Sequence, residues 1–482
     1  MSAVLTPQHP STMADSADRS GLPRALVEWL SNILGDRFTT NAAVCLEHGS
    51  DESAYEPCPP QAVAFPGSTN EVALIVQACV AHRVPVIPFG IGSSIEGHLL
   101  AVHGGVSIDM SRMNQVIEVR AEDLTAKVQA GVTREALNKA LAHTGFFFSV
   151  DPGANATIGG MVATAASGTN TVRYGTMRDN VLSLTVVTPQ GQVIRTARRA
   201  RKSSAGYCLT QLFTGSEGTL GIITEVVVKL HPQPEAIAAA VVHFPSVGAA
   251  VDTVIQAIQL GVPLARAELL DAMTIKAVNL HSRTTLAVEP TLFLEFSGST
   301  AQVEEQSAAL QSLVEDNGGG DFQWATRPEE RSRLWTPRHH AYFACLQLRP
   351  GCRSFTTDAC VPISVLAECL TETVADIQAS GLQAPVFGHV GDGNFHCLLL
   401  VDPGNPEEVK TAEAVSERLM RRAIRYDGTC SGEHGVGLHK MPYLEEEHGA
   451  ATVDVMRRIK RALDPLNIMN PGKVVHVQVG AA

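Results

Sequence analysis

The chain has 482 residues, with 37 lysines and arginines against 49 aspartates and glutamates, so its formal net charge at pH 7 is −12. This balance argues against nucleic acid as a partner, and the length suits two or three domains that each bury a core. The ten cysteines contain no Cys-x-x-Cys pair, so we expect reduced thiols of an intracellular protein. No apolar run reaches membrane-spanning length, which leaves only a peripheral membrane contact open.

The first 55 residues are expected to form a tail and a helical segment. Residues 1–20 lack the hydrophobic core of a signal peptide and the basic excess of a mitochondrial leader. A helix is predicted after Pro23, with Gly35 as its stop. The apolar face expected for it consists of Leu26, Trp29, Leu30 and Ile33.

A first domain is expected over residues 56–231. Ala62–Phe65 reads as a strand, and Ser68 with Glu71 forms a capping-box pattern at the start of a helix. A second strand around Val86 completes a βαβ unit.

A glycine-rich loop, Gly90–Gly97, follows this second strand. Its backbone N–H groups and hydroxyls can cradle a pyrophosphate, although an ordinary turn explains the loop equally well. The spacing is not Gly-x-Gly-x-x-Gly, and Lys473 is followed by valine where a Walker motif has serine or threonine. Two further segments rich in glycine and small residues, Pro152–Gly175 and Thr214–Thr224, would allow close approach of a large flat ligand.

A second domain is expected over residues 232–475, after the linker signal His231–Pro234. Strands and helices are predicted to alternate there, which indicates a mixed α+β substrate domain. The predicted strands are Ala238–Phe244 and Thr291–Phe296, and the predicted helices are Ala249–Leu260 and Gln302–Asp316.

Two histidines flank a hairpin signal in this second half. If Asp392 and Gly393 form a type I′ turn, His389 and His396 lie opposite each other with Cβ atoms about 5 Å apart. Glu433, in a glycine-rich stretch, supplies a carboxylate, and two imidazoles with one carboxylate leave positions open for substrate. A tight hairpin with histidines on its polar face is an equally good interpretation of the pair alone.

The glycine-rich segments, in this order, resemble the FAD-binding domain of the vanillyl-alcohol oxidase and p-cresol methylhydroxylase flavoproteins. Five motifs in the second half resemble the D-lactate dehydrogenase branch, whose relatives include the glycolate oxidase catalytic subunit and D-2-hydroxyglutarate dehydrogenase. The motifs are Leu334–Arg338, Thr357–Pro362, Gly388–His396, Glu433–Gly437 and Asn470–Lys473. The resemblance spans Pro59–Val474 and implies an α+β fold with a vanillyl-alcohol-oxidase-type FAD domain.

The resemblance implies non-covalent FAD, because covalent members of the wider family carry histidine where this chain has Ser93 and Ser94. The residues it assigns to FAD are Pro88, Gly90, Ile91, Gly92, Ser93, Ser94, Gly97, Pro152, Gly153, Thr157, Gly159, Gly160, Ser167, Gly168, Tyr174, Gly175, Glu217, Gly221, Ile223 and Asn470.

The implied reaction is oxidation of a D-2-hydroxy acid with hydride transfer to flavin N5. Zinc or manganese held by His389, His396 and Glu433 would lower the pKa of the substrate hydroxyl. His434 would act as general base, and Arg338 would clamp the substrate carboxylate.

D-Lactate is the first substrate candidate, since Thr356 is neutral where hydroxyglutarate-oxidising relatives appear to carry lysine; glycolate and D-2-hydroxyglutarate are the alternatives. The electron acceptor is left open among quinone, cytochrome and other carriers. We expect a cytoplasmic location, with a peripheral contact at the inner face of the membrane left open. A metal-dependent hydrolase and a flavin-binding module without catalysis are the competing classes.

Overall fold

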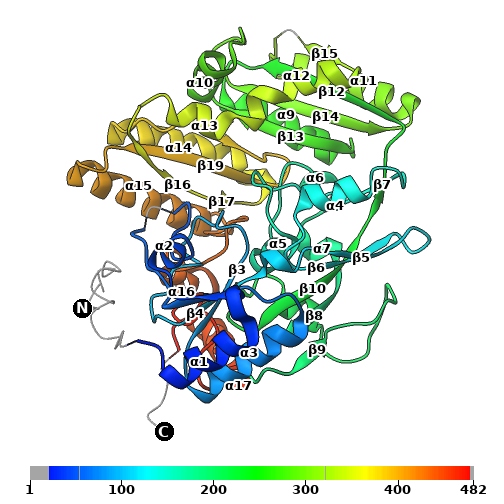
Figure 1. The fold of residues 1–482 in the computed structure, drawn as a ribbon. Helices are drawn as coiled ribbons and strands as arrows, with labels where there is room; N and C mark the ends of the chain where they lie inside the picture. The colour runs from blue at the N-terminus through cyan, green and yellow to red at the C-terminus, as the bar shows by residue number, and fades with distance from the viewer. Residues whose placement is uncertain (1–20, 54, 321, 478–482) are drawn as a thin grey trace.

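A computed structural model describes residues 21–53, 55–320 and 322–477 of the chain. It places two bodies one above the other (Figure 1). The lower body contains the blue and cyan N-terminal elements, and the upper body contains the green to orange second half. The tail predicted for residues 1–20 lies outside the described residues.

The lower body begins with a small four-stranded sheet in the order β1-β2-β4-β3. The predicted βαβ unit is present as β2 (Ala62–Ala64), α3 (Thr69–Ala81) and β3 (Val86–Phe89). The first and last of these strands both pair in parallel with β4 (Val106–Asp109), which lies between them. β1 (Phe38–Thr39) forms the antiparallel edge.

The N-cap of α3 is only half of the predicted capping box. Ser68 accepts a hydrogen bond from the backbone N–H of Glu71, as expected. The Glu71 carboxylate instead accepts from Arg37 and from the N–H of Gly67. Arg37, which is remote in sequence, thus takes the carboxylate away from the backbone N–H of Ser68.

The first helix, α1 (Arg24–Leu34), ends at Gly35 as predicted, but its buried face is shifted. Leu26, Leu30 and Leu34 are buried, whereas Ile33 is 41% exposed. The packing partner, α3, reaches only one stripe of this short helix.

A second sheet of the lower body is antiparallel throughout, in the order β5-β6-β10-β8-β9. Its strands are β5 (Val116–Arg120), β6 (Thr125–Gln129), β10 (Ile222–Lys229), β8 (Val181–Val187) and β9 (Val193–Arg195). The short helices α4 (Arg134–Ala140), α5 (Ile158–Thr164), α6 (Thr171–Tyr174), α7 (Met177–Asn180) and α8 (Leu209–Phe213) lie between them in the chain. The predicted linker begins with β11 (His231–Pro232), which pairs with β7 (Phe146–Phe147).

The upper body is built on one large sheet in the order β15-β12-β14-β13-β18-β19-β16, with β17 also paired to β19. Its strands are β12 (Ala236–His243), β13 (Leu264–Leu270), β14 (Thr291–Gly298), β15 (Gln323–Ala325), β16 (Arg353–Thr356), β17 (Ala359–Cys360), β18 (Val386–Gly388) and β19 (Asn394–Val401). The predicted alternation of strands and helices is therefore present.

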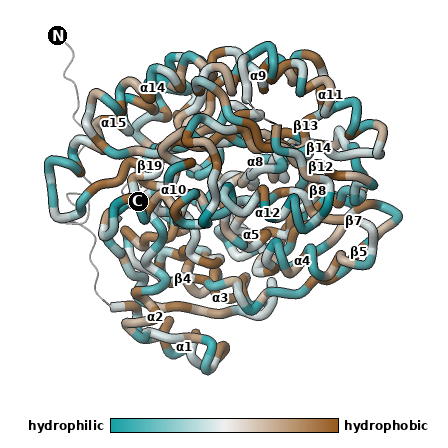
Figure 2. The backbone as a smooth tube through the Cα atoms, turned by 90° about the horizontal axis from the view of Figure 1, so that it is seen from above, coloured by the Kyte–Doolittle hydropathy of each residue, from teal (hydrophilic) through white to brown (hydrophobic). Residues whose placement is uncertain are grey.

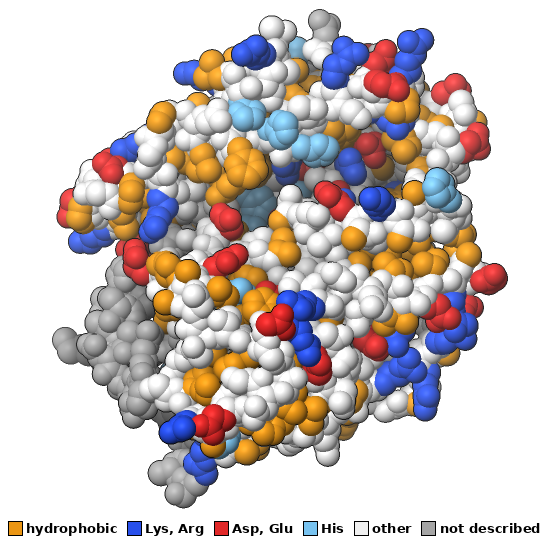
Figure 3. Space-filling view, viewed as in Figure 1, with side chains coloured by type: hydrophobic (Ala, Val, Ile, Leu, Met, Phe, Trp, Pro, Cys, Tyr) orange, Lys and Arg blue, Asp and Glu red, His pale blue; other side chains and the backbone are white. Residues whose placement is uncertain are grey.

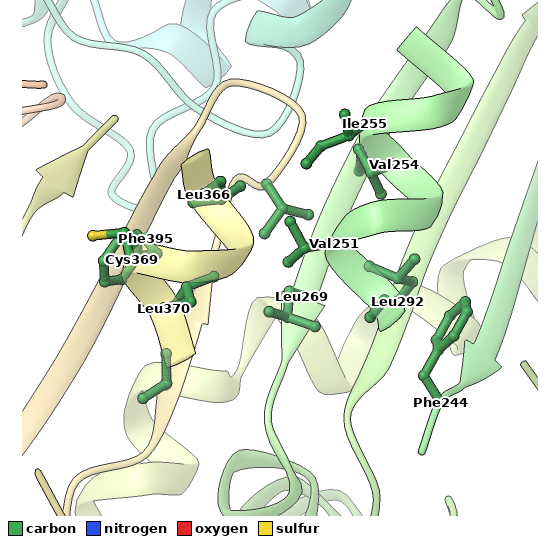
Figure 4. Close-up of a cluster of buried hydrophobic side chains, with 14 of the residues drawn as sticks. Phe244, Val251, Val254, Ile255, Leu269, Leu292, Leu366, Cys369, Leu370 and Phe395 are labelled. Atoms are coloured by element: carbon green, nitrogen blue, oxygen red, sulfur yellow. The ribbon is translucent and has the colours of Figure 1, made fainter. Parts of the chain in front are cut away.

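One face of this sheet is covered by α9 (Val247–Gln259), α11 (Thr300–Asp316), α14 (Leu366–Ser380) and α15 (Pro406–Arg425). Figure 4 shows α9 and α14 packing apolar side chains on the strands, with Val251 and Leu370 beside Leu269. Hydrophobic stretches follow the central strands in Figure 2, and the outer helices alternate in hydropathy.

The other face of the sheet packs against α10 (Ala272–Ser282), α12 (Pro328–His339) and α13 (Ala341–Leu346). The side chains of one strand alternate between the two faces. Leu269 therefore packs with α9, whereas Leu270 packs with α10 and α13. Glu268 shares the face of Leu270.

The chain returns to the lower body after α15, through α16 (Leu444–His448) and α17 (Ala450–Leu463), at the bottom of Figure 1. Ile459 and Leu463 of α17 pack against the core of the second sheet. The N–H of Asn470 then donates to the carbonyl of Val86 at 2.9 Å. The C-terminal segment thus packs against the first sheet of the lower body. Among the described residues, no helix combines the length and hydropathy needed to cross a membrane.

Candidate active site

The predicted metal-ligand histidines flank the hairpin between β18 and β19, but the predicted register is wrong. Phe387, rather than His389, pairs with His396. The carbonyl of His389 accepts from the N–H of Asp392 at 2.9 Å, inside a loop longer than two residues. A type I′ turn needs positive φ at both central residues, and of the predicted pair only Gly393 has it.

Neighbouring segments set the conformation of this loop. The carbonyl of Gly393 accepts from the N–H of Val361 at 3.0 Å, and the N–H of Gly391 donates to the carbonyl of Ala267 at 3.4 Å. These contacts are remote in sequence, so local turn rules could not include them.

The three predicted ligand side chains converge despite the shifted register. His389 Nε2 lies 3.4 Å and His396 Nε2 lies 3.1 Å from Oε1 of Glu433. One ligand atom from each residue lies within 4.8 Å of the other two. Figure 3 shows a hollow between the two bodies where acidic, basic and histidine side chains gather.

Both imidazoles are oriented through their second nitrogen. Nδ1 of His389 lies 2.7 Å from Oε1 of Glu268, and Nδ1 of His396 lies 3.1 Å from the carbonyl of Thr357. Because these oxygens only accept, each Nδ1 donates and each Nε2 faces Glu433. Metal-binding histidines commonly have this arrangement, so the donor set fits a divalent cation such as zinc or manganese.

The charges around His389 also favour a cation at this point. Burial alone would lower the pKa of His389, but Glu268 and Glu433 raise this pKa well above its ordinary value. A metal ion that binds here would therefore displace a proton.

Arg338 lies beside this cluster and is paired with a buried carboxylate. Its Nε and Nη2 atoms lie 2.8 and 2.7 Å from Oε2 of Glu268, and its guanidinium stacks 5.2 Å from the ring centroid of Phe387. The contacts to Glu268 do not use Nη1. Burial alone would raise the pKa of Glu268, but His389 and Arg338 hold it below its usual value, so Glu268 is ionised.

A second buried group of charges holds the loop that carries Glu433 and His434. Asp358, 1% exposed, accepts from the backbone N–H groups of these two residues at 2.9 and 2.8 Å. Lys440 Nζ lies 3.3 Å from Asp358 Oδ2 and 2.9 Å from Glu96 Oε1. One buried ammonium therefore compensates two buried carboxylates, which would be costly to leave unpaired.

His434 faces the cluster through its Nε2 atom. Its ring is stacked on that of His396, with centroids 5.0 Å apart, and its Nε2 lies 3.8 Å from Oε1 of Glu433. Its Nδ1 is buried and has no hydrogen-bond partner among the described residues. Burial lowers the pKa of His434 and outweighs the opposing effect of Asp358, so the imidazole is neutral near pH 7. A neutral imidazole can accept a proton.

The predicted FAD segments meet next to this cluster. A β-carbon on Gly90 would lie 2.7 Å from Oγ1 of Thr157, so the first two glycine-rich segments are in contact. Glu217 accepts from the N–H of Gly437 at 2.8 Å, and the amide of Asn470 donates to the carbonyl of Glu217 at 2.9 Å. Glycine backbone from several segments, with few side chains between them, fits a large flat ligand.

Other predicted FAD residues make contacts that packing explains. The ring of Tyr174 packs against that of His231 in a tilted arrangement with centroids 4.7 Å apart, and Ser94 donates to Asp51 at 3.0 Å. Gly221 lies against the carbonyl of Val187 within the sheet. Ile223 is buried in the core beneath the second sheet, whereas Ile91 is 45% exposed. The structure gives no contact that singles these residues out for a cofactor, and their role stays a prediction.

Sequence reasoning missed four charged residues that hold the site together. Asp358 was visible only as part of a motif. Glu96, Glu268 and Lys440 carried no local signal, because a charged residue is usually exposed and their partners lie far along the chain. Each of these side chains is 1% exposed, as is Asp358.

Two family models match the chain. The model described as "FAD binding domain" matches residues 60–197, and the model described as "FAD linked oxidases, C-terminal domain" matches residues 233–474. The chain belongs to the FAD-linked oxidase family. It is therefore an FAD-dependent oxidoreductase, and the resemblance found in the sequence is confirmed.

Relatives of this FAD-linked oxidase cover nearly its whole length. It is 48% identical over 465 residues to a probable mitochondrial D-lactate dehydrogenase of Danio rerio, covering 96% of this chain and 94% of the relative. A mitochondrial D-lactate dehydrogenase [cytochrome] of Arabidopsis thaliana is 44% identical, with 94% and 80% covered. Glycolate oxidase subunit GlcD of Bacillus subtilis is 35% identical, with 91% and 94% covered.

Solved structures confirm the predicted fold class. p-Cresol methylhydroxylase superposes with a TM-score of 0.78 at 19% identity, covering 96% of this chain and 99% of its own. Alkyldihydroxyacetonephosphate synthase has a TM-score of 0.72 at 22% identity, with 94% and 85% covered. The fold is thus the α+β arrangement of the vanillyl-alcohol oxidase type.

Proposed function

We propose that this FAD-linked oxidase dehydrogenates a short D-2-hydroxy acid, with D-lactate as substrate and pyruvate as product, and that it requires a divalent cation. The observation that carries the proposal is the convergence of His389, His396 and Glu433 beside the glycine-rich segments. The names of the Danio rerio and Arabidopsis thaliana relatives support D-lactate. The two competing classes, a metal-dependent hydrolase and a flavin module without catalysis, are not favoured by the family.

His389, His396 and Glu433 would hold the cation, zinc or manganese, through two imidazole nitrogens and one carboxylate. The glycine-rich segments around Gly90, Thr157 and Glu217 would hold FAD without a covalent bond. When bound, FAD supplies a two-electron acceptor through N5 and the cation supplies a Lewis acid for an oxygen ligand.

The protein's own groups then orient the substrate and take its proton. Arg338 would bind the carboxylate of the hydroxy acid and fix the position of C2. His434, neutral at pH 7, would accept the proton of the 2-hydroxyl as the hydride leaves C2. The substrate thereby loses one proton and one hydride, and its C–O bond becomes the carbonyl of the keto acid.

The candidate acids differ in what they carry beyond C2. Thr356 and Ser354 hydrogen-bond to each other at 3.2 Å on β16, so no cation stands at these positions for a distal carboxylate. This favours D-lactate over D-2-hydroxyglutarate. Glycolate differs from lactate by one methyl group, which is worth only about 1–3 kcal/mol of discrimination.

A substrate panel tests the proposal. Purified flavoprotein is mixed anaerobically with D-lactate, L-lactate, glycolate and D-2-hydroxyglutarate, and flavin absorbance is followed. We expect D-lactate to bleach the flavin fastest and L-lactate to leave it oxidised. Bleaching by L-lactate alone, or by none of the four acids, would overturn the proposal.

The electron acceptor and the compartment are further points for experiment. A cytochrome is the first acceptor to test, because the Arabidopsis thaliana relative is named for one, and a quinone is the second. The cytoplasmic location expected from the sequence stays a prediction, and these relatives are named as mitochondrial proteins.

A further inference from the structure

Glu268 joins two residues to which the proposed function gives separate tasks. It lies on β13, and its side chain is 1% exposed. Oε2 accepts from Nε of Arg338 at 2.8 Å and forms an ion pair with its Nη2 at 2.7 Å, and Oε1 lies 2.7 Å from Nδ1 of His389. The carboxylate thus bridges the expected substrate clamp and an expected metal ligand.

The two oxygens of Glu268 have distinct partners, and both oxygens must be acceptors. A carboxylate accepts through both oxygens, whereas a carboxamide has one accepting oxygen and one donating NH₂ group. Glutamine at this position would therefore lose one of the two contacts, and it would carry no charge to compensate Arg338. Hydrogen bonds to a charged acceptor are also the stronger kind.

Fixing one nitrogen of an imidazole determines how the other can be used. With Nδ1 of His389 donating to Glu268, the Nε2 lone pair is directed to the space next to Glu433, 3.4 Å away. The same carboxylate restrains the guanidinium of Arg338 along its Nε and Nη2 edge. The remaining nitrogen of the guanidinium, Nη1, is then held in one orientation, in which it can donate to the carboxylate of the substrate.

We propose that Glu268 is a positioning residue that couples cation binding at His389 to carboxylate binding at Arg338. The inference rests on the proposed function, because it presumes both of these tasks. It adds that one buried carboxylate prepares both sites, so a single substitution weakens both. A residue that only stabilised the fold would affect neither affinity in folded, FAD-loaded protein.

The test compares Glu268→Gln with a matched control, Glu71→Gln. Glu71 also pairs with an arginine, with Arg37 Nη2 2.7 Å from its Oε1, but it lies at the start of α3. Each protein is purified with FAD and checked by its flavin spectrum and thermal unfolding. Manganese affinity is then measured by competition with a chelator, and flavin reduction is followed over a range of D-lactate concentrations.

We expect Glu268→Gln to bind manganese about 10- to 100-fold more weakly, while Glu71→Gln matches wild type. Saturating manganese should restore most of the maximal reduction rate of Glu268→Gln. The apparent dissociation constant for D-lactate should stay raised, because manganese does not replace the lost partner of Arg338. A maximal rate that manganese restores, together with a D-lactate dissociation constant that it does not, distinguishes a positioning role from a folding defect. Added metal would not repair a folding defect.

Two outcomes have different meanings. If wild type binds manganese and oxidises D-lactate, and Glu268→Gln has the same affinities for both, the role of Glu268 is refuted while the proposed function stands. If wild type neither binds manganese nor reduces its flavin with D-lactate, the proposed function fails and the inference fails with it. If Glu268→Gln does not fold, Glu268→Asp, which keeps the charge on a shorter side chain, is measured in the same way, and unchanged affinities there also refute the role.

Discussion

Ser167 donates a hydrogen bond to Oε2 of Glu433 at 2.7 Å, across 266 positions of sequence. Ser167 follows α5 in a glycine-rich segment predicted to bind FAD, and Glu433 is one of the predicted metal ligands. The bond therefore ties the expected flavin side of the site to the expected cation side. It leaves Oε1 of Glu433 directed at the two histidines.

Removing this bond should affect the cation more than the flavin. In Ser167→Ala, Oε2 of Glu433 loses a donor and the carboxylate gains rotational freedom. We expect manganese affinity to fall about 10-fold, at the lower end of what outer hydrogen-bond partners contribute, and FAD content to fall by less. Chelator competition and the flavin spectrum measure the two quantities. Equal manganese affinity in the variant and wild type would show that the bond does not orient Glu433.

The lowered pKa of His434 sets the direction of the pH dependence. Burial moves this pKa below 6.5, and the base form is the deprotonated one. We therefore expect flavin reduction by saturating D-lactate to be constant above pH 6.5 and to slow as the pH falls below it. His434→Ala should slow reduction by about 10²- to 10⁴-fold and remove this step. A wild-type rate that still climbs between pH 7 and 9 would assign the base to another group.

Lys440 should be a major contributor to stability, because it is the buried cation between Glu96 and Asp358. Lys440→Met leaves the buried carboxylates of Glu96 and Asp358 without their shared ammonium partner. We expect the free energy of unfolding to drop by about 3–5 kcal/mol. Urea unfolding at pH 7 measures this. The control is Lys127→Met, which breaks a partly exposed pair with Glu225 on the sheet surface and should cost at most about 1 kcal/mol. Equal losses in the two variants would contradict the account.

The same buried pair predicts how stability changes in acid. Burial alone would raise the pKa of Glu96, but Lys440 and His439 lower it to about 2 from its ordinary 4.5. A depressed carboxyl pKa stabilises the fold above the unfolded value and loses that contribution as the pH falls through the folded one. The stability difference between wild type and Lys440→Met should therefore shrink between pH 4.5 and 2.

The contact between Gly90 and Thr157 gives a prediction for FAD. A β-carbon at Gly90 would lie 2.7 Å from Oγ1 of Thr157, whose hydroxyl also caps α5. Gly90→Ala should push the two segments apart and raise the dissociation constant of FAD, measured by flavin fluorescence on rebinding. Gly248→Ala is the control, because its β-carbon would have room. Unchanged FAD affinity in Gly90→Ala would show that the loop that carries Gly90 does not contribute to FAD binding.

The fold could be predicted from the sequence, and so could the convergence of the three proposed ligand residues, because both depend on residue types with narrow chemistry. Glycine-rich segments in a fixed order, and histidines with a carboxylate, restrict the possible partners by their chemistry alone. The predicted register of the β18–β19 hairpin was wrong because backbone hydrogen bonds with Val361 and Ala267, which are remote in sequence, set the conformation of its loop. Glu268 was missed because its partners lie 70 and 121 positions away, and no local pattern marks it as buried.

The most direct test of the central claim measures flavin reduction by D-lactate before and after metal removal. Wild type is reduced anaerobically in a stopped-flow instrument as purified, after chelation, and after manganese or zinc is restored; His396→Ala serves as the variant without a complete ligand set. The account predicts that chelated wild type and His396→Ala keep their FAD but lose most of their reduction rate, and that metal restores only wild type. Full reduction rates in metal-free wild type, or in His396→Ala, would contradict it.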